Sequence, residues 1–479
     1  MQQAFFRQII RTISSFPVSR LIAVGAFAWL TVLLAYSSVR SHYTATLWTY
    51  SALFAIYVFL CRPVFSGVQK NISRYAGYML ATGIAVRLLI VFAMPVWSED
   101  VWRFVWDGRL IVADIHPFAH TPVYFYEKGE WPWGLHAALY EKLNSKLWYS
   151  VYPPACQGVF ALAAWLFPNS DEGAVISIKL ILWCCECSTL WLFWRNRQYL
   201  AVVLWALNPA VILEICGNGH FEGALVCCMM WMFHAWRRQK YAWAGTFYAL
   251  AFSVKLWPLL FLPAIAAWAH RHSFLSFLTA YSVVCGLLFI PMFDAEIIAN
   301  MGKSLDLYFQ KFAFNGSIYY VLWELGLHFL RQYSLDKLIG MLLLPFPLIA
   351  VACFSWVLWK KRSFPPSVQA LSRACLWIFT VYLLCASTVH PWYVTFVLAL
   401  SLWQDPFFPP SQFTRGHNQS HFPLLFPIVW TWTAFFSYSH YENGTFLEQK
   451  GWIAAEYMLV GLFLIRDLRA VRAATQSNP

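Results

Sequence analysis

Runs of about 20 apolar residues recur along the whole of this 479-residue chain. One of them, RLIAVGAFAWLTVLLAYSSV, begins at Arg20. A helix needs roughly 20 such residues to cross ~30 Å of hydrocarbon. The composition agrees, because 60% of the residues are hydrophobic and only 12% are charged. We therefore predict a single all-α domain over residues 1–479, a polytopic membrane protein with about 12–14 transmembrane helices.

The basic residues stand in short segments between the apolar runs, and they fix the expected orientation. Lys and Arg near span ends favour the cytoplasmic side, so Arg7, Arg11 and Arg20 are predicted to be cytoplasmic. After three spans, residues 97–153 then reach the outer face as a long loop that carries amphipathic helices. The shortness of the basic segments argues against nucleic acid as a partner and for contact with membrane lipids, although the net charge is +12.

The later basic clusters can all be cytoplasmic if two weakly apolar segments, 154–168 and 317–331, do not cross the membrane. Every polar motif described below then faces outward. Scattered structural polar residues would not share one side, so this convergence predicts a functional site on the outer face. The hydrophilic stretch that begins at Gln404 is predicted to be a cytoplasmic loop.

The outer loop opens with the sequence SEDVWRFVWDGRLIVADIHPFAHTP. As a helix it would carry Asp100, Arg103, Asp107 and Asp114 on one face, beside an apolar flank, and would lie along the membrane surface. These charges either form ion pairs that stabilise the helix, or provide carboxylates that deprotonate an acceptor or hold a cation. Glu99 and Asp100 point about 100° apart on a helix, which argues against a close acid pair.

A second polar cluster lies in LNPAVILEICGNGHFEGALV, where one apolar run ends and the next begins. Glu214, Asn218, His220 and Glu222 are costly at membrane depth, and a functional site explains them. Gly217 and Gly219 would permit the tight outer turn that brings His220 and Glu222 to a cavity. The alternative is a plain capped hairpin.

Further polar residues interrupt later apolar runs. Lys255 either snorkels to an interface, or lies at the junction of two short segments and contacts a phosphate. The sequences FNGSIYY, which contains Asn315, and STVHPWYVTF, which contains His390 and Tyr393, combine hydrogen-bonding groups with aromatic faces. Sugars are bound by such surfaces, although helix caps have the same spacing.

Five of these strings resemble, in the same order, motifs of the polyprenyl-phosphate-sugar-dependent glycosyltransferases of the multi-spanning C-type fold, especially bacterial mannosyltransferase-like members. They are the first-loop string, VYPPACQGVF, the glutamate and histidine hairpin, AFSVKLWPLLFLP and HPWYVTF. Asp100 is similar to the family's first-loop catalytic acid, and Glu99 stands at its companion position. Asp107 and Arg109 belong to the same motif.

The resemblance implies inverting transfer of a hexose, with mannose as the expected sugar, from a polyprenyl phosphate sugar donor to a glycan or lipid acceptor. Asp100 would take the proton of the acceptor hydroxyl, while Arg103, Lys255 and His390 would neutralise the departing phosphate. The need for a divalent cation stays open, since acid pairs serve both metal-bound and metal-free members. A bacterial inner-membrane protein is expected, with its active site facing the periplasm or the cell exterior.

Two other classes of protein would use the same residues differently. A transporter or flippase for a polyprenyl-linked or anionic solute would line a pathway with these charges and would show inverted repeats, which we do not detect. A non-catalytic partner in a cell-envelope complex would not need Asp100.

Overall fold

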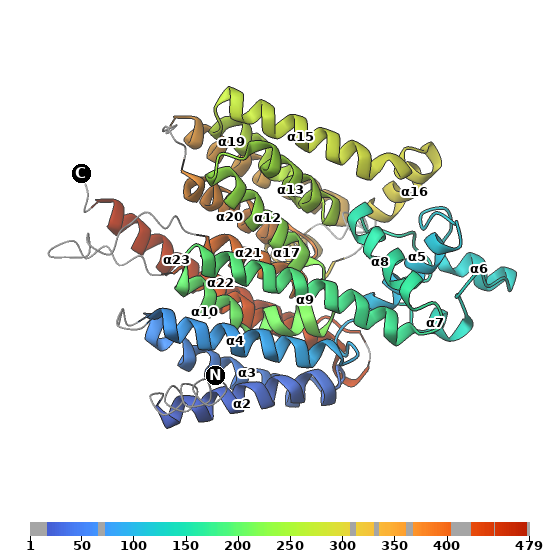
Figure 1. Ribbon diagram of the computed structural model, residues 1–479, viewed down its shortest axis with the longest axis horizontal. Helices are drawn as coiled ribbons and strands as arrows, with labels where there is room; N and C mark the ends of the chain where they lie inside the picture. The colour runs from blue at the N-terminus through green and yellow to red at the C-terminus, as the bar shows by residue number, and fades with distance from the viewer. Residues whose placement is uncertain are drawn as a thin grey trace, which may run out of the picture.

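Long helices run side by side as a bundle, and short helices of the predicted outer loop cover one end of it (Figure 1). The computed structural model describes residues 17–65, 72–306, 313–329, 335–360, 367–403, 423–444 and 446–476. Within these ranges the regular elements are all helical, and the β-type pairing is limited to isolated bridges between Thr388 and residues 314–315. The prediction of an all-α polytopic fold is confirmed.

The elements up to the hairpin at Gly219 are α2 (Val18–Ser37), α3 (Tyr43–Phe65), α4 (Ile72–Val91), α5 (Asp100–Val112), α6 (Pro122–Lys128), α7 (Ala137–Glu141), α8 (Pro154–Leu166), α9 (Asp171–Arg195), α10 (Tyr199–Ala206), α11 (Pro209–Val211) and the π-helical turn η1 (Ile212–Gly217). Those after it are α12 (Glu222–Arg237), α13 (Tyr241–Val254), η2 (Trp257–Phe261), α14 (Leu262–Trp268), α15 (Arg271–Phe289), η3 (Ile290–Met292), α16 (Ala295–Asp306), α17 (Ile318–Phe329), α18 (Leu335–Leu343), α19 (Pro345–Lys360), α20 (Val368–Cys385), α21 (Tyr393–Leu402), α22 (Leu425–Thr433), η6 (Ala434–Gly444) and α23 (Lys450–Gln476).

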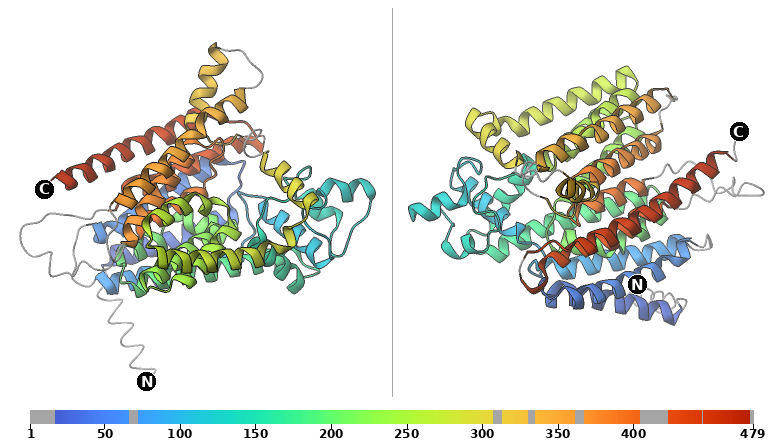
Figure 2. Two further views of the ribbon diagram at one scale, coloured as in Figure 1. Left: turned by 90° about the horizontal axis from the view of Figure 1, so that it is seen from above. Right: turned by 180° about the vertical axis from the view of Figure 1, so that it is seen from behind.

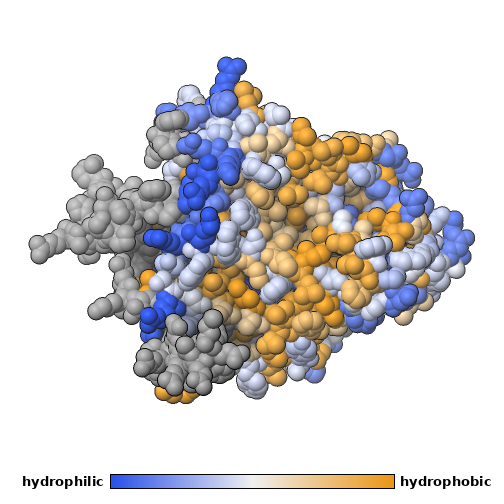
Figure 3. Space-filling model, viewed as in Figure 1, coloured by the Kyte–Doolittle hydropathy of each residue, from blue (hydrophilic) through white to orange (hydrophobic). Residues whose placement is uncertain are grey.

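Among the described residues, 7 helical segments are long and apolar enough to cross a membrane, and an eighth counts if α10 and Pro209–Gly217 form one span bent by 60°. The predicted number, about 12–14, also includes apolar runs that fold as shorter helices, such as α12 with 16 residues and α13 with 14. Other apolar runs fold as short or broken helices, such as Trp257–Trp268 and Tyr393–Leu402. The long helices still present a wide apolar band with hydrophilic residues at either end (Figure 3).

The two segments predicted not to cross are short helices. Helix α8 has 13 residues and α17 has 12, so each is about 20 Å long and too short for the hydrocarbon core. The predicted loop at Gln404 and the basic residues Arg7 and Arg11 lie outside the described residues.

The predicted polar motifs gather at one end of the bundle. Helix α5 is joined to the start of α9 by the ion pair between Arg109 and Asp171, and the start of α12 is joined to the end of α13 through Glu222 and Lys255. Helix α9 ends at Arg195, at the opposite end of the bundle. The views in Figure 2 agree, with α5 to α8 at one end and the C-terminal end of α23 at the other.

The first-loop helix differs from the surface helix that the sequence predicts. Helix α5 ends at Val112, and Asp114 follows it with φ +58°, so that carboxylate is not part of the charged stripe. Arg103 and Asp107 are buried against the loop and α8 instead of facing water. The stripe points inward because its charges pair with one another and with polar groups of residues 145–157.

The backbones of α5 and α8 approach closely at Gly108, where a Cβ would lie 2.2 Å from the carbonyl oxygen of Phe160. We expect Gly108→Ala to lower the free energy of unfolding by about 1–3 kcal/mol, because neither backbone has room to move. Thermal melting of the purified protein in detergent measures this. Gly158→Ala on α8, with nothing within 4 Å of the added Cβ, is the matched control and should not destabilise. Equal melting temperatures for the two variants would contradict the packing account.

Candidate active site

Two cavities meet at Asp100, at the polar end of the bundle. The one that contains Lys255, the Lys255 cavity, has a volume of about 280 Å³. The one that contains Arg103, the Arg103 cavity, has a volume of about 350 Å³. Asp100, Val151, Tyr152, His390 and Trp392 line both. A molecule bound in either cavity would therefore contact the same carboxylate.

The Lys255 cavity is charged at one end and apolar at the other. Asp100, Lys255 and two histidines, His220 and His390, form the polar end. Residues from the end of α18 and the start of α19 form the apolar wall, among them Leu343, Leu344 and Pro347. This cavity suits an amphiphile whose polar group lies beside Lys255.

The Arg103 cavity is lined by polar and aromatic residues, many of them from the first loop. Its polar lining includes Arg40, Glu99, Arg103, Asn144, Ser145, Ser150 and Ser304, and its aromatic lining includes Trp148, Tyr438 and Tyr441. Hydroxyls, amides and guanidinium groups on several sides suit a ligand rich in hydroxyl groups.

Asp100 is the first residue of α5, and its carboxylate is only partly exposed. The side-chain amide of Asn144 donates a hydrogen bond of 3.0 Å to Asp100 Oδ1. Burial raises the pKa of Asp100 above its ordinary value, while the Asn144 hydrogen bond and the charge of Lys255 act in the opposite direction. A carboxylate of raised basicity is what a general base requires.

Glu99 is held apart from Asp100 by a different partner. Its carboxylate forms an ion pair with Arg40, which in turn lies 4.1 Å from the centre of the Tyr441 ring. The two adjacent acids thus have separate partners, although Glu99 precedes α5 and does not lie on the helix. Within the described residues no group of three or more His, Cys, Asp or Glu side chains is arranged to hold a metal ion.

Lys255 lies at a break between two short helical segments. This agrees with the interpretation of the sequence in which Lys255 lies at the junction of two such segments. Helix α13 ends at Val254, and Lys255 has extended backbone angles of φ −147° and ψ 143° before η2 begins. Its Nζ lies 3.0 Å from Oε1 of the fully buried Glu222. The ammonium group also lies 5.3 Å from the Trp257 ring centre and 5.4 Å from that of Tyr393, which lines the same cavity. The buried carboxylate and the two rings hold the cation at the cavity wall.

His220 follows a tight turn in which Gly219 has φ +83°, a conformation that glycine adopts without strain. The imidazole stacks on Trp392, with ring centres 3.5 Å apart. Its Nε2 lies 3.5 Å from Glu214 Oε2. The turn therefore delivers His220 to the cavity, whereas Glu222, which was predicted to reach it as well, is fully buried outside the lining.

Glu214 anchors this turn from behind. It accepts hydrogen bonds of 3.1 Å from the Asn218 amide and 2.9 Å from the Tyr438 hydroxyl. Asn218 itself lies behind the lining of both cavities, and it also accepts a long hydrogen bond from the Trp97 backbone N–H. Glu214 and Asn218 therefore position the histidine and line neither cavity, whereas Tyr438 lines the Arg103 cavity.

His390 and His220 are uncharged in this arrangement. Burial and the nearby charge of Lys255 lower the pKa of His390 to about 3, and burial is also the main cause that places the pKa of His220 well below its ordinary value. Both imidazoles can therefore donate or accept hydrogen bonds at neutral pH. Lys255, and not a histidine, supplies the positive charge of this cavity.

Other predicted site residues are buried outside the linings that the structure describes for the two cavities. Asp107 accepts hydrogen bonds from Arg103 Nε at 2.7 Å, from Gln157 and from the Ser150 hydroxyl. Arg109 is held by Asp171 at 2.8 Å. Their contacts are those of groups that fix the first loop, with Asp107 orienting the cavity residue Arg103.

Asn315 likewise lies behind the Lys255 cavity. Its φ is +54°, and its amide donates a 3.0 Å hydrogen bond to the buried carboxylate of Glu456. Three cavity residues, Arg40, Asn144 and Trp392, were not singled out from the sequence. Trp392 stands within the string HPWYVTF, but Arg40 and Asn144 carry no local signal, because the fold alone brings them to Glu99 and Asp100.

Comparison with known proteins assigns the chain to a class. It is 23% identical to GPI mannosyltransferase 1 of Saccharomyces cerevisiae over 317 residues, which is 59% of this chain and 72% of that protein. It is 23% identical to GPI mannosyltransferase 1 of Eremothecium gossypii over 216 residues, and the match spans only about half of that relative, 53% of its length.

The model of glycosyltransferase family 87 matches residues 150–402, just over half of the chain. His220, Lys255 and His390 lie within the matched region, whereas Asp100 precedes it. The apolar helices and the family match identify a membrane glycosyltransferase. The chain belongs to glycosyltransferase family 87.

Proposed function

We propose that the protein transfers a hexose, with mannose as the expected sugar, from a polyprenyl phosphate sugar to a glycan or lipid acceptor, with inversion at the anomeric carbon. The reaction would take place at the outer face of the membrane, with a bacterial inner membrane as the expected location. One observation carries the proposal: a partly buried carboxylate, Asp100, and a cation, Lys255, line one cavity whose far wall is apolar.

The Lys255 cavity supports a lipid-linked donor. A polyprenyl chain would pack against the apolar wall formed by α18 and α19, and its phosphate would lie beside Lys255. His390 and His220, both neutral, would donate hydrogen bonds to phosphate or sugar oxygens. Tyr393 and Trp257 would cover the sugar ring with aromatic faces.

The Arg103 cavity supports the acceptor site. An acceptor there would contact Asp100, because the carboxylate lines both cavities. Inversion requires in addition that the acceptor hydroxyl meet the anomeric carbon on the side opposite to the departing phosphate.

The chemical step then uses groups of this chain alone. Asp100 accepts the proton of an acceptor hydroxyl as the oxygen attacks the anomeric carbon. The bond between that carbon and the phosphate oxygen breaks, and its electron pair leaves with the polyprenyl phosphate. Lys255 stabilises the negative charge that develops on the phosphate.

The pH dependence of transfer tests this assignment. Because the base must be ionised and burial raises the pKa of Asp100, kcat/KM should fall with decreasing pH at a pH above the ordinary range of an aspartate. Lys255→Met removes a charge that lowers this pKa. The fall of kcat/KM on the acidic side of the pH profile should therefore occur at still higher pH in this variant. Lys128 is an exposed cation of the first loop, so Lys128→Met should leave the acidic side of the pH profile unchanged. If kcat/KM falls at the same acidic pH in wild type and in Lys255→Met, the proposal is contradicted.

Membership of a glycosyltransferase family favours this reading over the transporter or flippase, which would use the same charges to line a pathway. The clustering of Asp100, Lys255, His220 and His390 at one end of the bundle also supports an enzyme, because a pathway would place charges along the midplane of both halves.

A further inference from the structure

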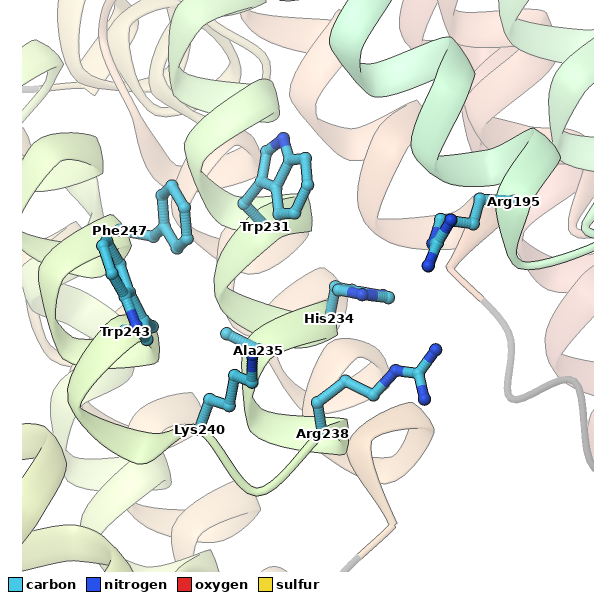
Figure 4. Close-up of a pocket in the computed structure, with 8 residues that line it drawn as sticks. All are labelled: Arg195, Trp231, His234, Ala235, Arg238, Lys240, Trp243 and Phe247. Carbon is cyan, nitrogen blue, oxygen red and sulfur yellow. The ribbon is translucent and has the colours of Figure 1, made fainter.

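A third cavity lies at the other end of the bundle, on the far side of the apolar band from Asp100. It has a volume of about 590 Å³ and lies between α9, α12 and α13 (Figure 4). Its lining is Arg195, Trp231, His234, Ala235, Arg238, Lys240, Trp243 and Phe247. We refer to it as the Arg195 cavity.

The polar part of the Arg195 cavity is cationic. Arg195, Arg238 and Lys240 are exposed at its rim, and none of the described residues that line it is acidic. His234 is 8% exposed, and its Nδ1 has no hydrogen-bond partner among the described residues. In Figure 4 the imidazole points into the space between the two arginines. Three cations that line one cavity suit an anionic ligand.

The floor of the cavity is aromatic. The Trp231 ring stacks on Phe247 with ring centres 5.5 Å apart and on Trp191 at 5.7 Å. Its indole nitrogen donates to Ser188, which fixes the ring. Trp191 and Trp243 are 46% and 59% exposed, so the aromatic floor continues to the lipid-facing surface. A free phosphate would not use such a floor, whereas acyl chains would pack on it.

The position of the cavity matches a lipid headgroup layer. Helix α9 has 25 residues and is therefore about 37 Å long, enough to cross the bilayer between Asp171, near the first loop, and Arg195. Tryptophans beside Arg and Lys at a span end are typical of the membrane interface. The Arg195 cavity thus lies at the interface opposite the one proposed for glycosyl transfer.

We propose that the Arg195 cavity binds the headgroup phosphate of an anionic phospholipid from the leaflet opposite the active site. The phosphate lies between Arg195 and Arg238 within reach of His234, and an acyl chain lies on Trp231 and Phe247. This site is separate from the donor cavity and does not depend on the proposed function.

The test measures the apparent affinity of the full-length protein for phosphatidylglycerol, by native mass spectrometry and by the concentration dependence of its melting temperature in detergent. The double variant Arg195→Gln/Arg238→Gln should bind about 20- to 30-fold more weakly, since each surface cation contributes about fivefold. Arg197→Gln/Arg271→Gln removes two charges from the same end outside the cavity and should bind like wild type. Phosphatidylcholine and inorganic phosphate should bind much more weakly than phosphatidylglycerol.

Three results would overturn the proposal. If phosphatidylcholine binds as tightly as phosphatidylglycerol, the cations of the cavity do not select an anionic headgroup. If inorganic phosphate stabilises the protein as much as phosphatidylglycerol, the site binds a free anion and not a lipid. Unchanged phosphatidylglycerol affinity in the double variant would place the lipid elsewhere. If the double variant does not fold, the single variants Arg195→Gln and Lys240→Gln, both at exposed side chains, should each weaken binding about fivefold.

Discussion

Asp100→Asn is expected to abolish glycosyl transfer while the protein still inserts into the membrane and still binds its lipid donor. Asn keeps the size of Asp and can still hydrogen-bond to Asn144, but it cannot take a proton at neutral pH. Loss of a general base typically lowers the rate by about 10²- to 10⁴-fold. Steady-state assays with polyprenyl phosphate mannose, after donor binding has been measured separately, test this directly.

Glu99→Gln is the matched control, because it removes the neighbouring carboxylate with the same chemistry. Glu99 forms a partly exposed ion pair with Arg40, so this variant should retain transfer within a few-fold of wild type. Asp107→Asn should lower the yield of folded protein, since Asp107 is fully buried with three hydrogen-bond donors around it. An active Asp100→Asn with an inactive Glu99→Gln would move the base to Glu99.

Lys255→Met is expected to lower kcat by about 10²- to 10³-fold, because the positive charge opposite the departing phosphate is lost. The Met side chain keeps the length and the apolar stem of Lys, so packing against Trp257 and Tyr393 should survive. Kinetics with the lipid donor, on protein whose folding has been confirmed by its melting temperature, measure the effect.

The variant also leaves the fully buried Glu222 without its counter-charge, which could lower the yield by itself. The double variant Lys255→Met/Glu222→Gln removes both charges and separates the two effects. Its yield should recover and its transfer should not. Recovery of transfer in the double variant would show that Lys255 acts only as the partner of Glu222. Lys255 would then have no role in binding the donor.

The sequence predicts the helical membrane fold well, because apolar runs long enough to span a bilayer have no other stable conformation there. Hydropathy does not register where the backbone breaks within an apolar run. At Lys255 the helix stops although the apolar run continues, and at Asn208 the Asn side chain caps a new helix in the middle of an apolar run.

The candidate site was predictable in part for a reason of topology. Basic segments assigned to the cytoplasm leave Asp100, His220, Lys255 and His390 on the opposite side, and the fold brings all four to one cavity. Burial was not predictable. The spacing of Arg103 and Asp107 predicts an ion pair, which forms at 2.7 Å, but it does not reveal that the pair is enclosed by Ser150 and Gln157.

The central claim is that Asp100 and Lys255 serve inverting transfer from a polyprenyl phosphate sugar, and the donor requirement of the purified protein tests it most directly. Membranes from a strain that lacks the protein supply the acceptor, and the purified protein receives either polyprenyl phosphate mannose or a nucleotide-activated mannose. We predict release of one polyprenyl phosphate per sugar transferred, inverted configuration at the anomeric carbon by NMR, and no transfer from the nucleotide sugar. Transfer from the nucleotide sugar alone, or retained configuration with the lipid donor, would contradict the account.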